Sequence, residues 1–174
     1  MGAFCPTLQV AVMDQAALVR ICGRASFNCS VDFKTLVYEL RDRGYQEFIL
    51  DLTECPILDS TFLGVLAAFG LKLSESPGQS ASVTLLNPNQ RILDLLDNLG
   101  VAHLFSTVEG SNPLSDKCRD VQQPDRGPSK VETTRTCLEA HQTLMNINPL
   151  NVPKFKEVAK FMEEDLKRIE AQKP

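Results

Sequence analysis

Apolar and polar residues follow two alternating patterns from Leu8 to Phe105. In short stretches the apolar residues alternate with polar ones or form a nearly continuous run, which is typical of strands. In longer stretches the apolar residues lie three and four positions apart, which is typical of helices. The predicted strands cover residues 8–12, 17–22, 48–52, 82–86 and, at an edge, 101–105. The predicted helices run from Ser30 to Gly44, from Ser60 to Leu73 and from Asn89 to Gly100. This alternation predicts a single α/β sandwich with a mixed β-sheet and covering helices.

The pattern changes after residue 109. Residues 110–129 are rich in proline, glycine and charge, which predicts a linker between a domain at 1–109 and a helical extension at 130–174. Two helices are predicted there, at 131–147 and 153–169, and together they form a hairpin. The second helix has an apolar face that the first cannot cover alone, so we expect the hairpin to dock on the domain of its own chain or, forming a homodimer, on a second copy.

Composition narrows the function classes. The net charge of −4, without a block of Lys or Arg, argues against nucleic acid or an anionic membrane as partner. The longest apolar stretch, Phe62 to Leu71, is about half the ~20 residues of a spanning helix. The start of the sequence lacks a basic region followed by an apolar one, so we expect no secretory signal and a cytoplasmic protein.

Residues that could carry catalysis or bind a metal are scattered. No two cysteines have the C-x2-C spacing of a metal site, and we expect them to be small buried residues and the protein to need no metal or cofactor. We expect His103 to be packed in its apolar run and His141 to face solvent or the linker. A hydrolase using Ser60 as nucleophile would need a base that the sequence does not indicate, so we expect no enzyme activity. The cysteines are Cys5, Cys22, Cys29, Cys55, Cys118 and Cys137.

The most informative segment is Phe48–Gly64, in which a buried strand and a turn lead to the polar triplet Asp59-Ser60-Thr61. The triplet lies where a helix begins. Unpaired amide groups and a partial positive charge at a helix N-terminus favour an anion, so a phosphate on a hydroxyl there could be accommodated. The alternative is that the triplet only caps the helix, as such residues commonly do.

Three segments resemble the STAS domain family, the fold shared by anti-sigma factor antagonists and the cytoplasmic part of sulphate transporters. In that family an aspartate precedes a phosphorylatable serine, a second Ser or Thr, and G-L-G. The resemblance therefore places the acceptor on Ser60. Phe62 stands where the family usually has glycine, and residues 23–27 lack the acidic residue common in antagonists. The three segments are 49–52 (ILDL), 58–66 (LDSTFLGVL) and 86–101, from Leu86-Asn87-Pro88 to Gly100-Val101.

The resemblance implies a protein-interaction switch. The unphosphorylated domain would bind an anti-sigma factor serine kinase, phosphorylation of Ser60 would separate the two proteins, and a PP2C-like, metal-dependent phosphatase would reset the switch. The residue types predict Phe62 either as an exposed aromatic that anchors the interface or as a ring folded back onto the sheet edge near Phe27 or Pro56. The rival interpretation is a constitutive scaffold or small-ligand-binding module that is not regulated through Ser60. The residues expected at the partner surface are Asp51, Asp59, Ser60, Thr61, Phe62, Gly64, Ser26 and Phe27.

Overall fold

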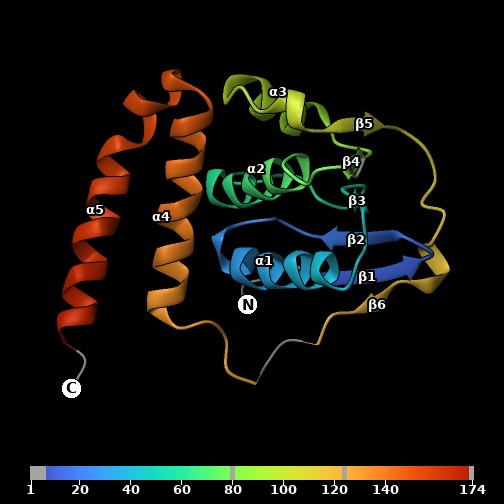
Figure 1. Ribbon diagram of the computed structural model, residues 1–174, viewed down its shortest axis with the longest axis horizontal. Helices are drawn as coiled ribbons and strands as arrows, with labels where there is room; N and C mark the ends of the chain where they lie inside the picture. The colour runs from blue at the N-terminus through green and yellow to red at the C-terminus, as the bar shows by residue number, and fades with distance from the viewer. Residues whose placement is uncertain (1–6, 79–80, 123–124, 173–174) are drawn as a thin grey trace.

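The computed structural model describes residues 7–78, 81–122 and 125–172, in which one mixed sheet is covered by helices (Figure 1). The strands are β1 (Thr7–Met13), β2 (Ala16–Cys22), β3 (Glu47–Asp51), β4 (Ser82–Leu86), β5 (Ser106–Val108) and β6 (Arg119–Asp120). The α-helices are α1 (Phe27–Asp42), α2 (Ser60–Ser74), α3 (Gln90–Asn98), α4 (Lys130–Ile147) and α5 (Val152–Ala171). None of the helices in these ranges combines the length and the apolarity needed to span a membrane.

The sheet has the strand order β5-β4-β3-β2-β1-β6. Strands β2 to β5 pair in parallel, whereas β1 runs antiparallel to both β2 and β6. Parallel neighbours need a crossover, and α1 and α2 supply the crossovers that enter and leave β3. The predicted α/β class with a mixed sheet is therefore confirmed.

One face of the sheet packs against α1 and α2 and forms the main core. Successive side chains of a strand point to opposite faces, so Phe48 and Leu50 enter this core while Ile49 faces away. Phe69 of α2 packs on Phe48 with ring centroids 4.8 Å apart and nearly perpendicular planes. The geometry suits the quadrupoles of the two rings and fixes α2 over β3.

Two local expectations near the end of the domain are wrong. Residues 101–105 form no strand, because Gly100 turns the chain at φ +69° and Ala102–Leu104 make a short 3-10 helix before β5 begins. His103 lies on that turn and is exposed, not packed. Without a strand, the alternation that would have buried its side chain is absent.

Residues 110–121 form a strap across the face of the sheet that α1 and α2 leave open. The strap runs from β5 to β6, on the right of Figure 1. Leu114 is buried against Ala11 and Leu18, and β6 adds two residues to the edge of β1. The predicted linker is thus attached to the sheet over part of its length.

The C-terminal hairpin docks on the domain of its own chain. Figure 1 shows α4 beside α2, with α5 on the outer side. One side of α4 packs on α5 through Val131 and Leu138, and another side adds Ala140 and Leu144 to the main core. In the single chain the hairpin therefore docks on its own domain, and a homodimer formed through the hairpin stays a prediction.

Candidate functional site

Asp59 holds together the first turns of α1 and α2. Its Oδ1 accepts a hydrogen bond from the Phe62 amide, and its Oδ2 accepts one from the Phe27 amide, both at 2.8 Å. Both amides lack partners within their own helices, so one carboxylate satisfies a donor at two N-termini. The loops before the helices are also joined, because the Asp59 amide donates to the carbonyl of Ala25. This junction places Ser26 and Phe27 at the same helix starts as Ser60.

Ser60 is the first residue of α2 and is partly exposed. Its Oγ lies 3.0 Å from Nε2 of His141 in α4. The other ring nitrogen, Nδ1, lies 2.7 Å from the carbonyl oxygen of Cys137, which can only accept. Nδ1 therefore carries the proton of the neutral ring, Nε2 is the acceptor, and the Ser60 hydroxyl donates to it.

The expectation that His141 faces solvent or the linker is wrong. Only 4% of the residue is exposed, and its ring packs against Phe155 of α5 with centroids 5.0 Å apart. His141 and Cys137 are four residues apart in α4, so both lie on the side of the helix that faces α2. Apart from Leu144, the buried residues of this helix face are small or polar, and an apolar periodicity does not reveal the face.

Three of the residues expected at the partner surface, Thr61, Phe62 and Gly64, are buried. Phe62 is 0% exposed and lies against Phe33 of α1, with ring centroids 4.5 Å apart, so the expectation of an exposed aromatic at this position is wrong. Thr61 is 5% exposed. At Gly64 an added Cβ would lie 2.5 Å from the carbonyl oxygen of Ala140, so α4 crosses α2 at this glycine. None of these three can contact a partner while α4 is docked.

Asp51 lies apart from this site. It alternates with Leu50 and Leu52, so its side chain is on the face of the sheet that carries the strap, where it pairs with Arg20 at 3.2 Å and accepts from Asn112 at 2.7 Å. Burial alone would raise the pKa of Asp51. Hydrogen bonds from Thr53, Asn112 and Arg20 outweigh burial and hold its pKa below the ordinary value. Asp51 therefore anchors the strap, and its expected place at the partner surface is wrong.

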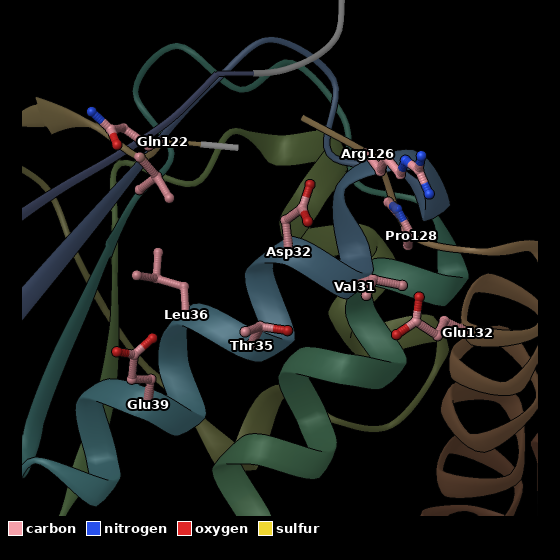
Figure 2. Close-up of a pocket in the computed structure, with 11 residues that line it drawn as sticks. Val31, Asp32, Thr35, Leu36, Glu39, Gln122, Arg126, Pro128 and Glu132 are labelled. Atoms are coloured by element: carbon pink, nitrogen blue, oxygen red, sulfur yellow. The ribbon is translucent and has the colours of Figure 1, made fainter. Parts of the chain in front are cut away.

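A separate cleft of about 420 Å³ lies between α1 and the chain that leads into α4 (Figure 2). Asp32 points into it from α1, Glu39 and Glu132 stand at its ends, and Arg126 is on the opposite wall. Burial raises the pKa of Asp32. Carboxylates outnumber the guanidinium among these four residues, so the cleft suits a small cationic or polar group better than an anion.

A family model described as the STAS domain matches residues 7–114. The chain belongs to the STAS domain family. The match covers more than half of the chain and includes Asp59 and Ser60, and it ends at Leu114, before α4. The part of the chain that supplies His141 thus lies outside the matched STAS domain. Among curated proteins, no sequence matches this chain significantly.

Solved structures share the STAS fold. The anti-sigma factor antagonist SpoIIAA in its unphosphorylated form is 13% identical at a TM-score of 0.52, over 60% of this chain and 89% of that one. The Bacillus cell fate determinant SpoIIAA in its phosphorylated form is 12% identical at a TM-score of 0.51, and the match covers 60% of this chain and 92% of that one. A protein from Thermotoga maritima described as an anti-sigma factor antagonist is 19% identical at a TM-score of 0.53, and the match covers 60% of this chain and 86% of that one. Identities this low show the fold alone.

Proposed function

We propose that this STAS domain is a phosphorylation-controlled protein-interaction switch of the anti-sigma factor antagonist kind, with Ser60 as the acceptor. The observation that carries the proposal is the position of Ser60. Its partly exposed hydroxyl stands at the N-terminus of α2, directly after the capping Asp59, whereas the neighbouring hydroxyl of Thr61 is buried. The partner is an anti-sigma factor serine kinase, and a PP2C-like phosphatase reverses the modification.

Phosphorylation would change the charge of this junction sharply. A phosphate brings roughly −1.5 to −2 charges at neutral pH. The first turn of α2 offers amides that favour an anion, so the domain itself tolerates the group. A partner that covers the junction would have to desolvate the phosphate next to the Asp59 carboxylate, and an unpaired charge buried at an interface is costly. The complex therefore separates when Ser60 is modified.

The test is site-resolved mass spectrometry of the protein isolated from its host, combined with co-purification. We expect phosphate on Ser60, and we expect Ser60→Ala, but not Ser60→Asp, to retain a kinase partner. Ser26 is the matched control, because it is a partly buried serine that caps the neighbouring helix. Phosphate confined to another residue, or equal partner retention by the two Ser60 variants, would refute the switch.

The Ser60–His141 pair also has the geometry of a nucleophile with its base, since the Cys137 carbonyl orients the imidazole. We propose a binding role and not catalysis, because His141 is enclosed between α2 and Phe155. A p-nitrophenyl acetate assay separates the two. We expect equal hydrolysis rates for the native protein and Ser60→Ala, and a burst that depends on Ser60 would contradict us.

The rival function, a scaffold or small-ligand-binding module independent of Ser60, is supported by the cleft beside Asp32. A ligand of that cleft would raise the melting temperature of the native protein but not that of Asp32→Ala. Under our proposal, partner binding is the same in Asp32→Ala as in the native protein.

A further inference from the structure

The C-terminal hairpin occupies the surface on which the proposed switch operates. α4 lies along α2, and its closest approach is at Gly64 and Ala140, one turn of helix beyond Ser60. At that crossing there is no room for even a methyl group on α2. The Ser60 hydroxyl donates a hydrogen bond to His141 of α4, so the proposed phosphorylation site already has a partner within its own chain.

The contact between the hairpin and the STAS domain buries polar groups beside apolar Ala140 and Leu144. Leu138, Ala159 and Leu166 belong to a small core inside the hairpin that is separate from the main core. The face of α4 toward the body places polar His141 among its buried residues. At the end of the hairpin, the Asn151 amide donates to the carbonyl of Leu99, but its own Oδ1 is buried without a hydrogen-bond partner. A buried polar atom without a partner weakens this contact, because no hydrogen bond offsets the cost of removing the atom from water.

We propose that docking of α4 and phosphorylation of Ser60 exclude each other, so that the hairpin is an intramolecular competitor for the switch surface. This inference rests on the proposed function and names its regulation. While docked, α4 holds the Ser60 hydroxyl and covers Thr61 and Gly64, and a partner reaches the junction only after the hairpin leaves. By linkage, whatever displaces α4 favours phosphorylation, and phosphorylation favours displacement by the same factor.

The geometry at Ser60 gives the reason. The 3.0 Å between Oγ and Nε2 is the length of one hydrogen bond and cannot hold a phosphorus atom with its oxygens. The ester oxygen of phosphoserine also carries no proton, so the neutral imidazole of His141 loses the hydrogen bond that it accepts from Ser60. The Gly64–Ala140 crossing, where the two backbones are in contact, is one turn of helix from Ser60, so moving α4 away from Ser60 also disturbs this crossing.

Hydrogen exchange of the full chain, followed by mass spectrometry, tests the proposal without needing the kinase. Phosphoserine is placed at residue 60 by genetic encoding, and phosphoserine at Ser74, exposed at the far end of α2, is the control for charge. We expect peptides of α4 to exchange roughly tenfold faster or more with phosphoserine at 60, while those of β2 and β3 are unchanged. Unchanged α4 exchange would overturn the proposal.

Two substitutions, Gly64→Ala and Ala140→Leu, should displace α4 without changing Ser60. Gly64→Ala introduces the Cβ that meets Ala140, and Gly127→Ala is its control, because an added Cβ there meets nothing within 4 Å. We expect faster α4 exchange only in Gly64→Ala. If its strands also lose protection, Ala140→Leu decides, since it changes the same crossing from the side of the hairpin and leaves the sequence of the STAS domain intact. Protected α4 peptides in that variant refute the competition.

The two proposals fail in different ways. An absence of phosphate on Ser60 in the host, with hairpin release by phosphoserine in vitro, refutes the switch and leaves the competition for the surface. Phosphate on Ser60 in the host, with α4 still protected, refutes the competition and leaves the switch.

Discussion

Asp59→Ala should destabilise the fold more than the loss of an ordinary helix cap, because this carboxylate caps two helices. Replacing an N-cap by Ala typically costs about 1 kcal/mol. Hydrogen bonds to a charged acceptor are stronger than neutral ones, and Asp59 accepts two at 2.8 Å. We therefore expect a loss of about 2–3 kcal/mol, equivalent to a fall in melting temperature of roughly 4–12 °C for a chain of this size.

The assay is urea unfolding followed by circular dichroism, read as a shift in midpoint at constant slope. Ser129→Ala is the matched control, because Ser129 caps α4 alone through the amide of Glu132, and we expect it to cost about 1 kcal/mol. Asp59→Asn retains a single acceptor and should fall between the two. If Asp59→Ala costs no more than Ser129→Ala, the carboxylate does not join the two helices energetically, and our account of the Ser60 junction is wrong.

Three further expectations follow from burial and charge. Phe62→Ala should lower the free energy of unfolding in urea by about 3–5 kcal/mol, because it empties a core site. Phe27→Ala, at a residue that is 47% exposed, should change it by less than about 0.5 kcal/mol. Similar losses in the two variants would contradict the buried position of Phe62. The lowered pKa of Asp51 stabilises the fold above the unfolded pKa of about 4, and this contribution is lost as pH falls through the folded value. In acid titrations Asp51→Asn should therefore show a shallower loss of stability than the native protein, and identical curves would argue against the strap anchor. Truncation after residue 125 should lower the melting temperature and expose apolar surface to a fluorescent dye, and an unchanged melting temperature would show that the hairpin is a passive appendage.

The periodic elements of the fold could be predicted from the sequence, because burial imposes a spacing on apolar residues. The strand at 82–86 is predicted with its observed bounds, and the helix from Ser60 ends within a residue of its observed end at Ser74. The start of α1 is three residues earlier than predicted, because the cap is Ser26 and Phe27 begins the helix. A cap depends on one local hydrogen bond and leaves little trace in a hydrophobic pattern.

The candidate site was harder to predict, because its parts come from distant segments. Asp59 and Ser60 follow from the helix start and the family resemblance, yet the partner of Ser60 is 81 residues away in α4. Apart from Leu144, the side of α4 that faces α2 consists of small and polar residues, and in the sequence it resembles a solvated surface. Gly64 was the available signal, since a helical glycine can mark close approach of a second backbone. The inward turn of Phe62 depends on how α1 packs on α2, which its own neighbours in sequence do not reveal.

The pairing of β6 with β1 has a consequence for synthesis on the ribosome. Gln9 and Asp120 bond across 111 residues of sequence, so the outer edge of β1 stays open until after the matched STAS domain, residues 7–114, has been made. An open strand edge is a template for pairing with other chains, and loop closure over such a separation is slow. Nascent or prematurely terminated chains that lack Arg119 and Asp120 should therefore be the forms of this protein most prone to aggregate.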